Sequence, residues 1–160
     1  MKEEKGLTYI GMVFLIILIA ILVFGAIYFF RIEQWKADLE NVKTDMLLIQ
    51  AKVKNVSNEQ TLEKKENVLV GTKISDMEDN NTIKEFLEKD IIDIESKKNN
   101  YYVLDQEDLG ELEIDQVQLE DNNLCIVDYK TNEVIYTSGF LHTDGNIYYK
   151  LSDIEKLSYE

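Results

Sequence analysis

An uninterrupted apolar run near the amino terminus constrains this chain more than any other feature. Residues 7–30, LTYIGMVFLIILIAILVFGAIYFF, form a run of 24 residues without a charged side chain. As an α-helix the run would reach about 36 Å, which is enough to cross a hydrocarbon core of about 30 Å with some tilt. The buried helix of a soluble domain rarely stays apolar on every face over such a length. The run therefore predicts a membrane-spanning helix.

The charge pattern constrains the part of the chain beyond that helix. The net charge is -14, and Lys2 and Lys5 balance Glu3 and Glu4, so the excess of carboxylates lies entirely beyond the apolar run. This distribution predicts one small acidic domain and excludes nucleic acid as a partner, because an acidic surface repels phosphates. Cys125 is the only cysteine and lies in an apolar stretch, where a buried thiol is expected.

The polar segment before the run, MKEEKG, does not continue into a secretory signal peptide. Such a peptide has an apolar core of about 7 to 15 residues and then a small-x-small cleavage site. Here the apolar run is longer, and residues 27–30 continue it past the small residues Gly25 and Ala26. The pattern therefore predicts either an uncleaved anchor or cleavage on the short polar side of the run.

The residues at that junction carry a resemblance to a known family. Lys5-Gly6-Leu7-Thr8-Tyr9-Ile10 before a long apolar helix resembles the class III signal of type IV prepilins and pseudopilins, which reads Gly, then Phe, Met or Leu, then Thr-Leu-Ile-Glu. The resemblance reaches to about residue 55. It implies that a prepilin peptidase cleaves after Gly6 and that Leu7 becomes the new, N-methylated amino terminus.

Two positions depart from the family pattern. Gly11 stands where the family has a glutamate that meets the terminal amine of a neighbouring subunit, and Tyr28 stands where many major pilins have a proline. These departures favour a minor or divergent pilin-like subunit over a main filament subunit. The alternative is a plain bitopic anchor with a chance Lys-Gly pair. The family likeness, together with the two lysines of the leader, predicts a cytoplasmic amino terminus and an extracytoplasmic carboxyl-terminal domain.

After the membrane run, the apolar residues recur at alternating steps of three and four, which is the period of one helix face. They are Ile32, Trp35, Leu39, Val42, Met46, Ile49, Val53 and Val56. Neither glycine nor proline occurs within residues 31–70, so the helix is expected to continue as an amphipathic stalk over residues 31–66 until Gly71 ends it.

Two partners could cover that stripe. A parallel coiled coil needs complementary charges beside the stripe, and Arg31 opposite Lys36 is repulsive. Leu47 and Leu48 widen the stripe, which suits a helix packed on a sheet of the same chain. We expect intramolecular packing, and the coiled coil is the alternative.

The rest of the chain, residues 67–160, predicts a small head of short strands and helices. The expected strands are 101–104, 124–129, 134–137 and 147–149, with turns at 130–133 and 144–146. Three short helices are also expected. Thr82 with Glu85 starts a helix that reaches Ile91 and is broken at Asn99 and Asn100. Asp105 caps a helical turn that reaches Leu112, and Ser152 with Glu155 starts the last helix. The predicted fold class is α+β, with a long transmembrane helix that continues into a stalk packed against a small antiparallel sheet.

Few residues suit catalysis or cofactor binding. His142 is the only histidine and is expected to be a solvated turn residue, so neither a zinc site nor a Cys-His pair is predicted. Asp105, Glu107 and Gly110 match the start of a calcium-binding EF-hand loop, but Leu109 and Gln116 break the match. No catalytic residue, cofactor or metal ligand is predicted, and a calcium site in the loops at 76–79 or 120–123 is left open.

Four segments are expected: a leader (1–6), a transmembrane helix (7–30), the stalk (31–66) and an acidic head (67–160). The expected function is that of a non-enzymatic pilin-like or pseudopilin-like subunit, which joins a pilus or a type II secretion-like filament after leader cleavage. Its expected partners are a prepilin peptidase, other pilin-like subunits through the amino-terminal helix, and the lipid bilayer. The alternative is a permanent bitopic protein whose extracytoplasmic domain binds or senses a partner.

Overall fold

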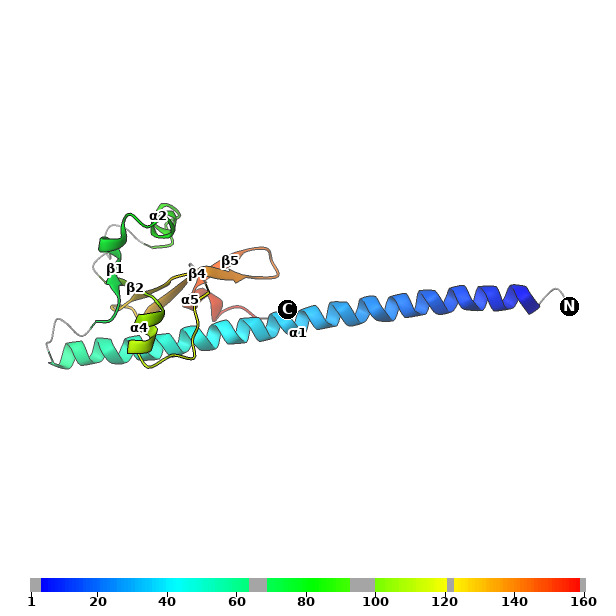
Figure 1. The fold of residues 1–160 in the computed structure, drawn as a ribbon, viewed down its shortest axis with the longest axis horizontal. Helices are drawn as coiled ribbons and strands as arrows, with labels where there is room; N and C mark the ends of the chain where they lie inside the picture. Colours follow the sequence, from blue (N-terminus) through cyan, green and yellow to red (C-terminus); the bar gives the residue numbers. More distant parts are fainter. Residues whose placement is uncertain (1–3, 64–68, 93–99, 121–122, 159–160) are drawn as a thin grey trace. The chain divides into compact units, whose positions relative to one another are not determined.

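The computed structural model describes residues 4–63, 69–92, 100–120 and 123–158. Helix α1 (Glu4–Glu63) is followed by a five-stranded antiparallel sheet and short helices (Figure 1), so the predicted α+β fold class is confirmed. The chain divides into two compact units, Met1–Glu40 and Asn41–Glu160.

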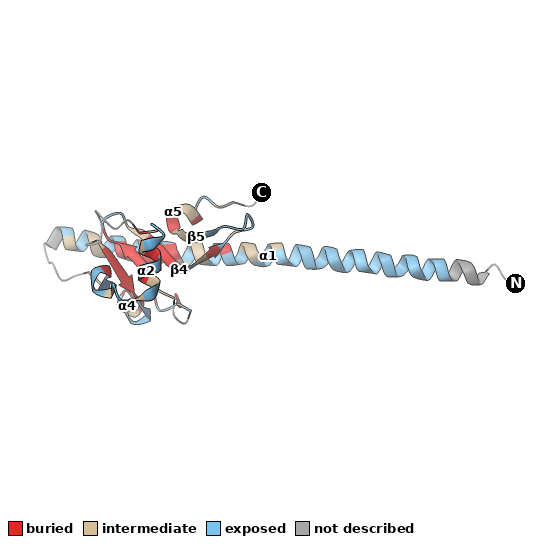
Figure 2. Cartoon of the chain, turned by 90° about the horizontal axis from the view of Figure 1, so that it is seen from above, coloured by how far each residue is buried: buried red, intermediate tan, exposed pale blue. Residues whose placement is uncertain are grey.

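In the first unit, α1 carries exposed apolar side chains on all its faces. Every residue from 9 to 30 is exposed, and Figure 2 shows this stretch in the colour of exposed residues. By length and composition, α1 is long and apolar enough to cross a membrane. This agrees with the predicted single membrane span.

In the second unit, the strands succeed one another across the sheet in chain order. They are β1 (Thr72–Lys73), β2 (Tyr101–Leu104), β3 (Cys125–Asp128), β4 (Glu133–Leu141) and β5 (Ile147–Lys150). Each strand pairs with the next in antiparallel register. The four predicted strands are confirmed, whereas the two-residue strand β1 was too short to show an alternating pattern.

Strand β4 extends four residues beyond the predicted end at residue 137 and begins one residue earlier than predicted, and a bulge carries it past Gly139. The pairing with β5 shifts register between Ile135 and Phe140. Gly139 has a φ of +64°, and a Cβ at this position would meet the ring of Tyr149. A glycine is therefore needed for β4 to bend and still pair with β5.

Both faces of the sheet are covered. Figure 1 shows α2 (Asn81–Glu88) on one side and α1 on the other. On the α2 side, a buried cluster joins the short 3-10 helix η1 (Ile74–Met77) and α2 to alternate residues of the strands. Its buried members are Ile74, Ile83, Phe86, Ile92, Tyr101, Val103, Ile126 and Ile135. Because side chains alternate along a strand, Leu104, Cys125, Val127, Val134 and Tyr136 face the opposite side.

The part of α1 that belongs to the second unit packs on that opposite face. Met46, Ile49 and Val53 are fully buried. The Gln50 side-chain amide donates to the Asn132 carbonyl oxygen at 3.0 Å, and the Ser57 hydroxyl donates to the Tyr129 carbonyl oxygen at 2.9 Å. The predicted intramolecular packing of the stalk is therefore confirmed.

Leu47 does not take part in that packing, so one detail of the prediction was wrong. Its side chain is 41% exposed, whereas Leu48 is half-buried. Leu47 comes one residue after the buried Met46, and one helical step of about 100° turns it away from the sheet.

Helix α2 has a different amino-terminal cap from the predicted one and ends earlier than predicted. The Asn80 side-chain oxygen, and not Thr82, accepts from the backbone N–H groups of Thr82 at 2.9 Å and Ile83 at 3.3 Å. Asparagine is a stronger cap than threonine, and it precedes Thr82 by two residues. The helix ends at Glu88 and does not reach Ile91, because Asp90 has a φ of 55°.

That carboxyl end is a Schellman motif. The Ile91 N–H donates to the Phe86 carbonyl oxygen at 3.1 Å, and the Asp90 N–H donates to the Leu87 carbonyl oxygen at 3.3 Å. The turn returns Ile91 to the buried cluster. The predicted break at Asn99 lies outside the described residues.

The two remaining short helices differ in how they begin. Helix α4 (Gln106–Glu111) starts at the predicted cap, Asp105, whose carboxylate accepts from the Glu107 N–H at 2.8 Å. Helix α5 (Leu151–Ile154) has no side-chain cap, so the predicted cap at Ser152 was wrong. The Ser152 N–H instead donates to the Glu133 carboxylate at 3.0 Å, which ties α5 to β4.

Gly71 was predicted to end α1, but residues 69–70, directly before it, are not helical, and residues 64–68 lie outside the described ranges. Gly71 precedes β1 with a φ of +101°, and a Cβ there would lie 2.6 Å from Leu104 Cδ2 and 2.7 Å from the Val103 carbonyl oxygen. The glycine therefore allows β1 to approach β2, which is the physical reason for its position.

Candidate functional site

The three residues singled out at the amino terminus lie in α1. The backbone of Gly6 and Leu7 is helical, since α1 begins at Glu4. Gly11 has open space where a Cβ would be, with no atom within 4 Å. It leaves a shallow apolar notch beside Ile10 and Phe14. Cleavage after Gly6 and a subunit contact at Gly11 stay predictions.

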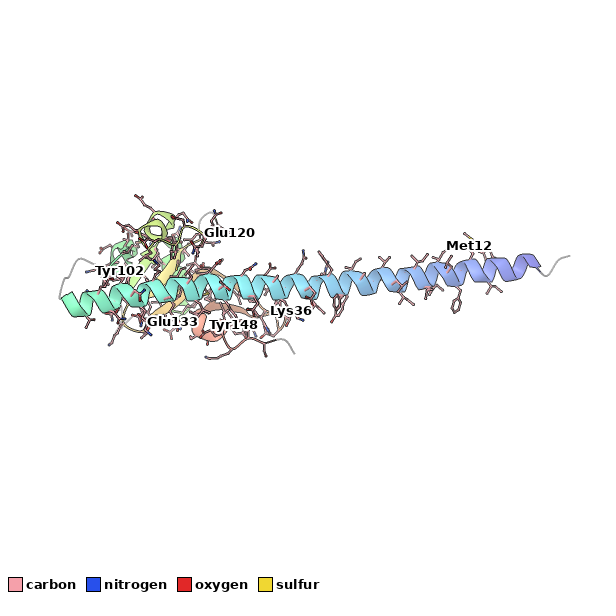
Figure 3. All side chains as sticks on the ribbon, turned by 90° about the horizontal axis from the view of Figure 1, so that it is seen from below. Met12, Lys36, Tyr102, Glu120, Glu133 and Tyr148 are labelled. Carbon is pink, nitrogen blue, oxygen red and sulfur yellow. The ribbon has the colours of Figure 1, made fainter. Side chains whose placement is uncertain are left out.

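The side chains around this notch are available for contact. Ile10 is 66% exposed and Phe14 is 73% exposed. Figure 3 shows the neighbouring Met12 side chain projecting from the helix, and Met12 is 61% exposed. Such a surface is stable in lipid or against other apolar helices, because the exposure of apolar side chains to water is unfavourable in free energy.

Cys125 and His142 do not form a catalytic pair. Cys125 is fully buried in β3, and burial raises the pKa of its thiol far above the usual range, so the thiol stays protonated and unreactive. His142 comes directly after β4, in the turn that leads to β5.

The expectation that His142 is solvated was wrong. Its side chain is only 15% exposed, and its ring meets the Tyr148 ring edge-on with centroids 5.8 Å apart. Its Nδ1 accepts a hydrogen bond from the Asp144 N–H at 3.2 Å. The tight turn folds the imidazole back over the hairpin, and this explains the burial.

Asp144 organises the same turn. Its carboxylate accepts from the Asn146 N–H and from the Tyr148 hydroxyl, both at 2.8 Å. These hydrogen bonds lower the pKa of Asp144 well below its usual range. The cluster is accounted for by turn formation, without a ligand.

No group of three or more His, Cys, Asp or Glu side chains within the described ranges is arranged to hold a metal ion. Asp105, the first residue of the imperfect EF-hand match, caps α4.

Polar side chains line two of the cavities formed by the described residues of the second unit. The larger, of about 320 Å³, lies beside Asp128, Glu133 and Lys150. The Asp128 carboxylate of this cavity already makes hydrogen bonds within the chain. Asp128 is 1% exposed and accepts from the Lys130 N–H at 2.9 Å and from the Thr131 hydroxyl at 2.7 Å. These two hydrogen bonds stabilise the β3–β4 turn.

The smaller cavity, which we call the Asp45 cavity, has a volume of about 200 Å³. It is lined by residues of α1, of the segment that precedes β3, and of β4. They are Val42, Asp45, Gln118, Leu119, Glu120, Asn123, Leu124, Tyr136 and Ser138. In the view of Figure 3, Glu120 lies on one side of α1 and Glu133 on the other, so the two cavities are separate.

Burial affects two polar groups that line the Asp45 cavity. Asp45 is half-buried, and burial raises the pKa of its carboxyl group. Tyr136 is 9% exposed, and its hydroxyl has no hydrogen-bond partner in the described part of the chain. Burial, together with the nearby Cys125 and Asp45, raises the pKa of this phenol far above its usual range.

Sequence reasoning missed this cavity, although one signal pointed to it. Asp45 comes three residues after Val42 and four before Ile49, so it lies on the edge of the apolar stripe. A carboxylate at that edge must be partly covered once the stripe packs. Tyr136 gave no comparable signal, because an aromatic residue in a strand is ordinary.

Comparisons with known proteins add no family assignment. No protein-family model, no curated protein and no solved structure matches the chain. The likeness to pilins rests on the residues around Gly6 and on the arrangement itself. A long amino-terminal apolar helix followed by a small antiparallel sheet is compatible with a pilin-like fold.

Proposed function

We propose that this chain is a non-enzymatic, membrane-anchored, pilin-like subunit that a prepilin peptidase processes after Gly6. The observation that carries the proposal is the composition of α1. Its amino-terminal stretch is apolar and exposed on every face, and its later part carries a single stripe packed on an antiparallel sheet. Together with Lys5-Gly6-Leu7, this is the arrangement that the family resemblance implies.

The exposed stretch explains how such a subunit would work. Residues 9–30 need a cover of lipid or of other apolar helices, because their side chains are exposed to whatever surrounds α1. Helices in lipid associate by close packing and not by a hydrophobic drive between them. A helix of this kind can therefore exchange lipid neighbours for helices of other subunits, which is the step that filament assembly requires.

Gly11 determines which role we expect for this subunit in a filament. Its notch is apolar and lacks the carboxylate that would neutralise a neighbour's terminal amine. A charge inside the membrane costs roughly 2.5–3.5 kcal/mol on insertion scales, so a missing counter-charge weakens assembly. We therefore propose a minor subunit that joins a filament built by glutamate-bearing major subunits.

Leader processing tests the proposal directly. The chain is co-expressed with a prepilin peptidase, and its amino terminus is determined by intact mass. We expect loss of residues 1–6 and the mass of one added methyl group on Leu7. Gly6→Leu should block the cut, and Gly25→Leu, a matched glycine replacement deeper in α1, should not.

Two outcomes would contradict the proposal. One is a leader retained in the wild-type chain, and the other is equal trimming of the Gly6→Leu variant. Either result would favour the permanent bitopic protein, whose head binds a partner without assembly.

The minor-subunit role has its own test. Filaments are sheared from cells that express a glutamate-bearing major pilin together with the wild-type chain or Gly11→Glu, and the subunit is quantified by immunoblot. Gly11→Glu should raise incorporation, because it restores the counter-charge. Abundant filaments made of the wild-type chain alone would refute the minor role.

A further inference from the structure

Two stretches of the chain match the acceptor sequence for N-linked glycosylation, in which an asparagine is followed at the second position by serine or threonine. They are Asn55-Val56-Ser57 and Asn80-Asn81-Thr82. A sequence of three residues is too short to make a modification site by itself. The surroundings of the two asparagines decide which of them a transferase can reach.

Asn55 lies in the part of α1 that packs on the sheet. Its side chain is exposed, but the Ser57 hydroxyl, which the transferase must recognise, donates to the Tyr129 carbonyl oxygen at 2.9 Å. Releasing this segment from its helix would also expose Val53, which is fully buried. The Asn55 sequence is therefore inaccessible in the folded chain.

Asn80 lies in a turn between η1 and α2, on the face of the sheet opposite α1 (Figure 1). The residues on either side of it, Asp79 and Asn81, are exposed. The backbone of Asn80 is already extended, with a φ of -71° and a ψ of 126°. Only the first turn of α2 has to open to extend the rest of the sequence, and helix ends open more readily than helix interiors.

The two ends of the Asn80 side-chain amide have different roles. Oδ1 caps α2 by accepting from the backbone N–H groups of Thr82 and Ile83, and this turns Nδ2 away from the helix. Nδ2 is not among the buried polar atoms that lack a partner in the described part of the chain, so it reaches solvent. A saccharide attached to Nδ2 leaves Oδ1 as an acceptor, and the cap is therefore compatible with the modification.

An acidic residue near Asn80 is a second difference between the two sequences. Some oligosaccharyltransferases also require an aspartate or glutamate two positions before the acceptor asparagine. Glu78 occupies this position for Asn80, whereas Val53 occupies it for Asn55. Accessibility and the longer acceptor sequence therefore select the same asparagine.

We propose that Asn80 is a site of N-linked glycosylation, with a polyprenyl-diphosphate-linked oligosaccharide as the donor. Asn80 Nδ2 attacks the anomeric carbon of the saccharide and loses one proton to a base of the transferase. The bond from that carbon to the diphosphate oxygen breaks, and polyprenyl diphosphate leaves with the electron pair. One N-glycosidic bond replaces one glycosyl phosphate bond, and nothing is oxidised or reduced.

This inference rests on the proposed outward placement of the head, because the transfer takes place on the side of the membrane to which the saccharide donor is exported. It does not rest on leader cleavage or on filament assembly. A permanent bitopic protein with the same orientation would carry the same saccharide.

Transfer in vitro tests the acceptor site. The full chain in detergent micelles is incubated with a purified oligosaccharyltransferase that reads only the three-residue sequence, and with a synthetic farnesyl-diphosphate-linked trisaccharide. Peptides of residues 53–59 and 78–84 should both accept the saccharide, because neither is folded. The full chain should accept one saccharide, which mass mapping should place on Asn80. A folded chain that is modified on Asn55, or that stays bare on Asn80, would overturn the inference.

Variants separate the acceptor sequence from the helix cap. Thr82→Val removes the hydroxyl without touching the cap and should abolish transfer, whereas Thr82→Ser should retain it. Asn80→Asp keeps a capping oxygen and should accept no saccharide, with an unfolding temperature that shows an intact fold. Asn55→Asp is the matched control and should leave transfer unchanged. Equal transfer to the wild-type chain and to Thr82→Val would contradict the assignment.

The chain isolated from its own cells gives the decisive result. Its peptides are mapped by mass spectrometry, and protease added to spheroplasts reports which side of the membrane holds the head. We expect a head that is digested and an Asn80 that carries a saccharide. A digested head with a bare Asn80 would overturn this inference and leave the proposed function standing. A protected head would overturn the outward placement, on which both depend.

Discussion

Ile49 offers the sharpest test of how the stalk and the sheet hold each other. Its side chain is fully buried on the face of α1 that packs on the sheet. Truncation to alanine removes three carbon atoms from a close-packed interior and leaves a cavity behind. Changes from isoleucine to alanine at such sites cost about 2–5 kcal/mol, compared with a total stability of about 5–15 kcal/mol for a typical domain.

Leu47 supplies the matched control, because it lies two residues earlier on the same helix and is 41% exposed. Leu47→Ala should change stability by no more than about 0.5 kcal/mol, as surface substitutions usually do. Both changes leave alanine in a helix, where its propensity is the highest of all residues. The difference between the two variants therefore measures packing against the sheet and not helix propensity.

The assay is urea unfolding of a soluble fragment that begins at Arg31, monitored by the near-ultraviolet circular dichroism of its tyrosines. Sedimentation should show a folded monomer, with the midpoint lowered strongly by Ile49→Ala and little by Leu47→Ala. Equal midpoints for the two variants would refute the packing. A stable dimer that Ile49→Ala dissolves, while the head stays folded, would instead establish the coiled coil.

Three further predictions can be checked by thermal unfolding. Gly71→Ala combines a positive φ with a backbone clash and should cost about 2–4 kcal/mol, whereas Gly145→Ala, with a φ of 86° in open space, should cost only about 1 kcal/mol. Asn80→Ala should cost about 1 kcal/mol through the lost helix cap, and Thr82→Ala no more than about 0.5 kcal/mol; the reverse order would restore Thr82 as the cap. Burial raises the pKa of Asp45 above 3.8 in the folded chain. The ionised carboxylate therefore lowers the free energy of unfolding at neutral pH. This destabilisation disappears as the pH falls through the raised pKa toward 3.8, because the carboxyl group is then protonated in both the folded and the unfolded chain. Asp45→Asn should therefore stabilise the chain by less than about 1 kcal/mol at about pH 7 and not at all well below the unfolded pKa; destabilisation at neutral pH would contradict this.

The features that sequence predicted well depend on periodicity or on a local cap. The stripe through Met46, Ile49 and Val53 predicted the buried face of α1 because helical geometry fixes which residues share a side. Strand β2 and the Asp105 cap of α4 were predicted at their observed positions, since each is specified within a few residues. Such signals need no knowledge of the rest of the fold.

The features that sequence missed depend on pairing across the fold. Strand β1 exists because Thr72 pairs with Val103, and Gly71 matters because Leu104 lies against it. The length of β4 is set by its bulge against β5, which no local pattern in the segment around Gly139 expressed. The start of α5 is fixed by the contact between Ser152 and Glu133, which are nineteen residues apart.

The Asp45 cavity shows how the two kinds of information combine. The helix period places Asp45 at the edge of a stripe, and this alone predicts partial burial of a carboxylate. Whether that burial is compensated depends on what the sheet brings to the same place, and the sheet brings Tyr136 and the apolar Leu124 but no cation within the described ranges. Asp45→Asn keeps the shape of the side chain and removes its charge, so the change in unfolding free energy at about pH 7 measures how much of the cost of burying this carboxylate the fold leaves uncompensated.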